Sequence, residues 1–117
     1  MNDRPLTAYK VLTADEMHRL EQDGRFAGAP VDLADGYVHL STADQLTETV
    51  DKHFAGQDGL WIAAVDVAAL GDQLRWEPSR GGQLFPHLYA PLLLEAVVAY
   101  SPLERDGDGG IRLPVTG

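Results

Sequence analysis

The 117 residues are enough for one ordinary domain with a real hydrophobic core, and 44% hydrophobic with 23% charged residues is typical of a globular protein. The chain holds no cysteine, which excludes a disulfide framework and a thiolate metal site. A net charge of −9 argues against generic binding to nucleic acids or anionic membranes, because such binding needs clustered Lys and Arg. A small-molecule ligand is therefore the expected partner.

The sequence predicts a cytoplasmic protein. Apolar runs such as Leu92-Leu93-Leu94 are far too short to cross a bilayer. The first residues, Met1 to Pro5, lack the basic and apolar regions of a signal peptide. The sequence does not predict an oligomeric state.

The first third of the chain predicts a strand, a helix and a loop. Residues 8–12 are expected to form the strand, and residues 14–23 a helix that ends at Gly24. Residues 24–35 contain glycine, proline and several small side chains, which is typical of a loop. Within that loop we expect a brief edge strand at Val31 and Leu33.

The rest of the chain predicts a second main helix and several strands. Ser41 or Thr42 is expected to cap a helix in which apolar residues recur every four positions and which ends near Gly56. Residues 68–74 predict a short turn or helix. Strands are expected at residues 60–67, where the strand should be buried on both faces, 75–77 and 96–100, with a weak terminal strand at 111–113 and an extended segment at 85–91.

These elements together predict a single α+β domain with about six strands, mainly antiparallel, and two or three helices. The domain should span residues 1–117, with its core over about 8–103 and a tail over 104–117.

Two short stretches carry most of the candidate chemistry. In Asp35-Gly36-Tyr37-Val38-His39-Leu40-Ser41-Thr42, a period of two places Tyr37, His39 and Ser41 on one face and the apolar residues on the other. His87 and Tyr89 repeat this spacing between two prolines, whose fixed backbone keeps the segment extended. We interpret the two stretches as the walls of one pocket.

Each candidate has a purely structural alternative. In the functional interpretation, His39 and His87 act as general bases or as hydrogen-bond donors to a ligand. In the structural interpretation, they are half-buried histidines that only hold the fold together. Glu77 would bind a ribose hydroxyl or stabilise a developing cation, unless it only pairs with Arg75 or Arg80. Glu95 is a second, weaker candidate acid, and Trp76 is expected in the pocket wall or the core. His39, His87 and Glu77 could supply three metal ligands, but no closely spaced histidine pair occurs, and we expect no metal site.

The motifs D-G-Y-V-H-L-S-T and F-P-H-L-Y-A-P-L, together with V-D-V and W-E between them, resemble the bacterial domain-of-unknown-function 952 family over residues 9–103. One departure is Ala90, where that family typically has glycine. The family looks like a compact relative of the ADP-ribosyltransferase fold. The resemblance thus implies a split antiparallel β-structure and an NAD or ADP-ribose-like ligand.

The same resemblance implies roles for the candidate residues. His39, supported by Ser41, would hold the adenosine-side ribose or phosphate, while His87 and Tyr89 would flank the nicotinamide end. Glu77, with Glu95 as the second choice, would serve as the ribose-binding acid of an NAD-dependent transferase. Apart from the resemblance, Tyr37 and Trp76 are further candidates for contact with the ligand. Two alternatives stay open, a non-enzymatic metabolite-binding module and an accessory interaction domain, because shared folds do not imply shared activity.

Overall fold

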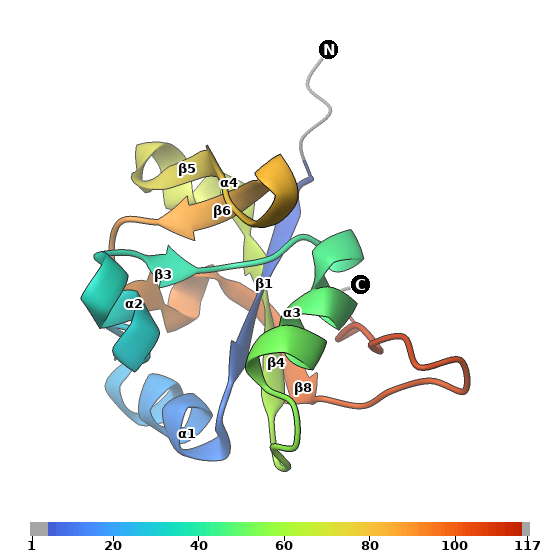
Figure 1. The fold of residues 1–117 in the computed structure, drawn as a ribbon. Helices are drawn as coiled ribbons and strands as arrows, with labels where there is room; N and C mark the ends of the chain where they lie inside the picture. Colours follow the sequence, from blue (N-terminus) through green and yellow to red (C-terminus); the bar gives the residue numbers. More distant parts are fainter. Residues whose placement is uncertain (1–4, 116–117) are drawn as a thin grey trace.

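The strands form three small antiparallel sheets in the computed structural model, which describes residues 5–115 apart from the Arg80 side chain. The central sheet has the order β1–β4–β8, a second has the order β3–β6–β5, and β2 pairs with β7 (Figure 1). The strands are β1 (Thr7–Leu12), β2 (Arg25–Phe26), β3 (Val38–His39), β4 (Trp61–Asp66), β5 (Leu74–Pro78), β6 (Leu84–Leu88), β7 (Leu92–Leu93) and β8 (Val97–Pro102). The predicted α+β domain is confirmed, with eight short strands in the described chain rather than about six.

The central sheet is covered on both faces. Ile62 and Ala64 of β4 belong to a cluster with α3 (Leu46–His53), whose Leu46 and Val50 are buried there. Ala63 and Val65, on the opposite face, belong to the larger core, to which α1 (Ala14–Asp23) contributes Met17 and Leu20. This arrangement confirms the prediction of a strand buried on both sides.

The second sheet is joined to the central one at a single bridge. The backbone N–H of Tyr9 donates to the carbonyl of Ser41 at 2.8 Å, and the N–H of Ser41 donates to the carbonyl of Tyr9 at 2.9 Å. The chain that leaves β3 therefore docks on β1 before it enters α3 (Figure 1). The bridge brings the edge of one sheet against the edge of the other.

Side-chain caps explain where the two longer helices begin. The Thr13 hydroxyl accepts from the N–H of Glu16 at 3.1 Å, and the Glu16 carboxylate accepts from the N–H of Thr13 at 2.9 Å. Thr42 precedes a short 3₁₀ turn (Ala43–Gln45) that leads into α3, and the Gln45 side chain accepts from its N–H at 3.0 Å. Both predicted helix starts are confirmed.

The prediction of a loop with an edge strand at Val31 and Leu33 is wrong. Pro30–Asp35 forms a short helix, α2, which ends at Gly36 in the left-handed conformation at φ 89°. Proline suits the first position of a helix, and the Asp32 carboxylate accepts from the N–H of Ala29, the residue before the helix, at 2.8 Å. Small residues and proline thus begin a helix here.

The weak terminal strand predicted at residues 111–113 is also wrong, since only an isolated bridge between Arg105 and Ile111 forms. The predicted turn or helix at 68–74 is confirmed as α4 (Val67–Leu70) followed by a 3₁₀ turn (Gly71–Gln73). Two further 3₁₀ turns lie at Arg80–Gly82 and Leu94–Ala96. Within residues 5–115, every helix is too short or too polar to traverse a bilayer.

We expect Gly24→Ala to destabilise the protein by about 1 kcal/mol, because Gly24 ends α1 at φ 73° and a side chain there strains the left-handed backbone. A Cβ at this position would meet no atom within 4 Å, so the backbone alone causes the loss. Urea unfolding measures it. Gly107→Ala is the matched control, since that glycine also has open space around it and lacks a positive φ. Equal effects of the two substitutions would contradict this account.

Candidate functional site

One face of the β3–β6–β5 sheet carries the polar candidates. His39 pairs with His87 across β3 and β6, and His87 pairs with Arg75 across β6 and β5. Directly opposed residues on antiparallel strands project from the same face, so the three side chains form one row. Glu77 projects from the same face, two residues beyond Arg75 on β5. The alternating strand pattern predicted from the sequence thus places His39 and His87 together.

His39 is held by a buried carboxylate. The Oδ1 atom of Asp32 accepts from the His39 ring Nδ1 at 2.6 Å and from the His39 backbone N–H at 3.0 Å. The other oxygen, Oδ2, accepts from the Lys10 ammonium at 3.0 Å and from the Ala29 N–H at 2.8 Å. Asp32 is only 1% exposed. Its four donors come from β1, from β3 and from the turn before α2.

These contacts decide the charge of Asp32. Burial alone would raise the pKa of its carboxyl group. The hydrogen bond from the His39 ring, the positive charge of Lys10 and the two backbone N–H groups outweigh burial and lower the pKa to about 2. Asp32 is therefore a carboxylate at neutral pH, and His39 Nδ1 is a donor.

The second nitrogen of His39 faces another acid. Its Nε2 lies 3.0 Å from the Oδ2 atom of Asp35, which ends α2 and is 46% exposed. A neutral imidazole carries one N–H and can donate to only one of these two carboxylates at a time. Two carboxylates of α2, Asp32 in its first turn and Asp35 at its end, thus face the same ring.

Glu77 gathers the second group of polar side chains. Its Oε1 atom accepts from the His87 ring Nδ1 at 2.8 Å and from the Tyr89 hydroxyl at 2.7 Å. The hydrogen bond from Tyr89 and then that from His87 lower the pKa of Glu77, and the same bond to Glu77 raises the pKa of Tyr89. His87 is buried whereas Glu77 is half-buried. Because Nδ1 donates to Glu77, the neutral His87 ring has its lone pair on Nε2.

Tyr37 lies between the two histidines. Its ring stacks on His87 with centroids 4.1 Å apart and lies 4.6 Å from His39, while the two imidazole centroids are 5.6 Å apart. Burial, followed by the charges of Asp35, Glu77 and Asp32, raises the pKa of the Tyr37 phenol. Tyr37 and Tyr89 both stay protonated at neutral pH and can donate hydrogen bonds.

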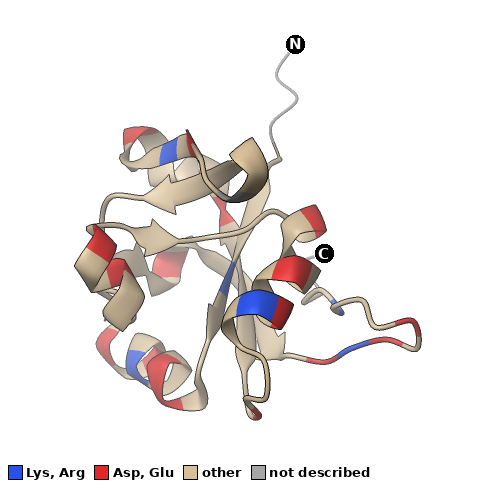
Figure 2. Cartoon of the chain, viewed as in Figure 1, with Lys and Arg blue, Asp and Glu red and all other residues tan. Residues whose placement is uncertain are grey.

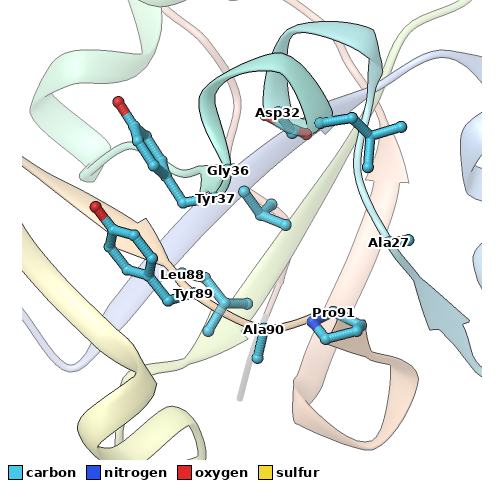
Figure 3. A pocket seen from close by; sticks show the side chains of 10 residues that line it. Ala27, Asp32, Gly36, Tyr37, Leu88, Tyr89, Ala90 and Pro91 are labelled. Carbon is cyan, nitrogen blue, oxygen red and sulfur yellow. The ribbon is translucent and has the colours of Figure 1, made fainter.

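A cavity of about 250 Å³ opens beside the two tyrosines. Its walls are Ala27, Asp32, Leu33, Gly36, Tyr37, Val38, Leu88, Tyr89, Ala90 and Pro91. Figure 3 shows the rings of Tyr37 and Tyr89 side by side, with both hydroxyl groups pointing away from Ala90 and Pro91. The cavity is therefore bordered by ring surfaces and aliphatic groups, while the polar row lies beyond the tyrosines.

The surroundings of the site are mostly acidic. Acidic residues outnumber basic ones over the helices and loops (Figure 2). Arg75 lies over the Tyr89 ring, 4.9 Å from its centroid, and is exposed, whereas Lys10 is already paired with Asp32. In the described part of the chain, no three His, Asp or Glu side chains are placed to hold a metal ion.

Two predicted site residues lie elsewhere. Ser41 is buried, and its hydroxyl lies 2.9 Å from that of Thr49 on α3. Trp76 is half-buried and lies opposite Pro86, on the face of β5 away from Arg75 and Glu77. Local alternation placed Ser41 with His39, but the strand ends before Ser41 and the chain turns to β1.

The structure also resolves smaller points of the sequence interpretation. Glu95 is exposed and lines a separate cavity of about 230 Å³ with Ala69 and Leu93. Glu77 pairs with His87 and Tyr89, with Arg75 contributing only at longer range to its pKa; the Arg80 side chain lies outside the described residues. Ala90 has no positive φ, so its backbone accepts alanine without strain.

Sequence reasoning missed Lys10, Asp32 and Asp35 as parts of the site. A charged residue within the apolar segment Ala8–Leu12 is a usable signal, because a buried ammonium needs a partner. Proline followed two positions later by aspartate at residues 30–32 is typical of a helix start and marks Asp32. Neither signal predicts that Lys10 and Asp32 contact each other.

We expect Lys10→Met to lower the free energy of unfolding by about 3 kcal/mol, because it leaves a buried carboxylate without its cation. Chemical denaturation at neutral pH measures the loss. Arg105→Met is the matched control, since Arg105 pairs with Asp51 at an exposed site where such pairs contribute about 1 kcal/mol or less. If Lys10→Met is as stable as Arg105→Met, the buried Asp32 carboxylate does not depend on the Lys10 cation, and this account is contradicted.

Asp32 should also contribute to the loss of stability in acid. Its pKa is about 2 when folded and near 3.8 when unfolded, so the folded state binds the proton less readily. The resulting stabilisation, about 2 kcal/mol, is fully present above about pH 4 and is lost as the pH falls toward 2.

Urea unfolding of the wild type and of Lys10→Met/Asp32→Asn at pH 5 and pH 2 tests this: the double variant should lose about 2 kcal/mol less on acidification. The control Asp72→Asn, at an exposed position, should follow the wild type. An identical acid response in all three proteins would refute the assignment.

Comparison with known proteins agrees with the resemblance seen in the sequence. Residues 11–100 match the family described as "Protein of unknown function (DUF952)". The crystal structure of protein CC0527 from Caulobacter crescentus is 46% identical, with a TM-score of 0.82 over 91% of this chain and 93% of that chain. The solution NMR structure of CC0527 is 46% identical, with a TM-score of 0.77 over 91% of each chain. No curated protein of assigned function matches. The chain belongs to the DUF952 family.

Proposed function

We propose that this chain binds a nucleotide of the NAD or ADP-ribose class on the polar face of the β3–β6–β5 sheet. The observation that carries the proposal is Glu77, whose Oε1 atom accepts from both His87 and Tyr89. Those two bonds fix the carboxylate in one orientation, and neither of them involves its other oxygen, Oε2. A fixed, ionised oxygen at a half-exposed site is suited to accept a hydrogen bond from a ribose hydroxyl.

The other side chains of the row fit the same ligand. The phenol of Tyr37 supplies a donor, and its ring stacks on His87. The Tyr89 hydroxyl already donates to Glu77, so its oxygen can only accept from a ligand. Arg75, exposed and resting over Tyr89, is the cation available to a phosphate. The distance of 5.6 Å between the two imidazoles favours contact of both histidines with one sugar and its neighbouring groups. The proposal therefore differs from the roles expected from the sequence, in which His39 and His87 contact opposite ends of the dinucleotide.

The proposal extends to transfer of the ribosyl group. The bond from the anomeric carbon to the nicotinamide nitrogen would break with its electron pair going to nitrogen, while an acceptor hydroxyl bonds to the same carbon. The Glu77 carboxylate would stabilise the cationic ribose, and His87 Nε2 would take the acceptor's proton. A kinship with the ADP-ribosyltransferase fold is part of this proposal. It is supported by the division of six of the strands into two three-stranded antiparallel sheets.

A second candidate is a non-enzymatic metabolite-binding module. It is favoured by the ring of His39, both of whose nitrogens lie within hydrogen-bonding distance of carboxylates, Asp32 at 2.6 Å and Asp35 at 3.0 Å. A histidine held in this way serves as a fixed wall of a binding site. This candidate predicts saturable binding without release of nicotinamide.

Titration of the protein with NAD and with ADP-ribose, followed by calorimetry, should show saturable binding that Glu77→Gln weakens about tenfold, because the charged acceptor for the ribose is lost. Glu95→Gln is the matched control and should leave the affinity unchanged, since Glu95 lies at the other cavity. Release of nicotinamide from NAD, measured by chromatography, separates the transferase from the binding module.

The outcome that contradicts the proposal is equally specific. Absence of binding by both nucleotides to a protein with a normal unfolding transition would remove the nucleotide ligand. Equal weakening by Glu77→Gln and Glu95→Gln would place the ligand away from the polar row.

A further inference from the structure

The cavity beside Tyr37 and Tyr89 offers few hydrogen-bonding groups to a ligand. Asp32 is its only charged wall residue, and all four hydrogen bonds to that carboxylate are taken up within the protein. The tyrosine hydroxyls point away from Ala90 and Pro91, so the wall at this end is mainly apolar (Figure 3). An apolar lining of this kind selects apolar groups, because a polar group there would lose its water without gaining a partner.

The size of the cavity limits what it can hold. An apolar cavity of about 150 Å³ is enough to bind benzene, whereas sites for whole drug-sized ligands span about 300–1,000 Å³. At about 250 Å³, this cavity suits one ring or a small fused pair of rings and is too small for an entire dinucleotide. The remainder of a larger ligand would lie outside it.

We propose that this cavity is the site for an uncharged planar ring, held against Tyr37 and Tyr89 at the edge of the polar row. The ring is the apolar part of a ligand whose polar part reaches Glu77 and His87. The inference rests on the proposed function only for the identity of that polar part, and the ring site stands on the cavity itself. Uncharged aromatic amides and purine bases belong to the class it accepts.

Ala90 is the wall residue that limits the size of the ring. It lies next to Tyr89 in the chain, it is half-buried, and its methyl group packs against the larger core while bordering the cavity. A larger side chain at this position would extend into the space that the ring occupies. The backbone there has no positive φ, so a substitution brings no strain of its own.

Benzamide and adenine are suitable probes because they are uncharged and planar. In the wild-type protein, NMR titration should shift the methyl signals of Ala27, Val38 and Ala90 and leave those of Ala69 and Ala96 unchanged, since the last two border the other cavity. Cyclohexanecarboxamide has a puckered ring of similar size and should bind about tenfold more weakly than benzamide, because it cannot lie flat against the tyrosines.

Ala90→Leu should weaken benzamide binding about tenfold or more by filling the cavity. Ala69→Leu makes the same substitution in the wall of the second cavity, at an exposed residue, and should leave the affinity unchanged. If Ala90→Leu does not fold, as judged by its unfolding transition, the methyl signals that the probes shift in the wild-type protein decide alone whether the ring binds in this cavity.

Three results would overturn the inference: no shift with either planar probe, shifts at Ala69 and Ala96 instead, or full benzamide affinity in a folded Ala90→Leu. These outcomes are separable from those of the nucleotide titration. Benzamide binding at Ala90 without binding of NAD or ADP-ribose would retain the ring site and reject the proposed function. Nucleotide binding that Glu77→Gln weakens and Ala90→Leu does not would retain the function and reject the ring site.

Discussion

The buried carboxylate of Asp32 is the contact on which the site depends. It joins the Lys10 ammonium of β1, the His39 ring and backbone of β3, and the N–H of Ala29 before α2. An ion pair removed from water costs desolvation that its attraction barely offsets, so such a pair is a poor source of stability in itself. Its effect here is positional, because the three elements can meet in only one way if all four donors are to be satisfied.

That constraint explains how a polar face can lie so close to the core. On the β3–β6–β5 sheet, Val38 and Leu88 pack into the larger core, while His39 and His87 project from the opposite face. Asp32 fixes the first histidine and Glu77 fixes the second, each through the ring Nδ1. The result is a row of side chains whose orientations are fixed by contacts within the protein, as the proposed binding site would require.

The site has two chemically different halves. One is the ionised and hydrogen-bonded row around Glu77, and the other is the mainly apolar cavity bordered by Ala90 and Pro91. Tyr37 and Tyr89 separate them, with rings on the apolar side and hydroxyls directed away from it (Figure 3). The proposed nucleotide ligand has two matching parts, a flat ring and a hydroxyl-rich sugar.

The sequence by itself determined what depends on neighbours in the chain. Strand alternation put His39 opposite the apolar Val38, and the capping residue Thr13 started α1, because both patterns act over a few residues. Tertiary structure decided the rest. Lys10 and Asp32 are 22 positions apart, and only the folding of the chain that places α2 and β3 beside β1 brings them together. Tertiary contacts also placed Ser41: its backbone pairs with β1 once β3 has ended, and its hydroxyl lies beside that of Thr49 on α3. No local pattern encodes which distant strand a segment will meet.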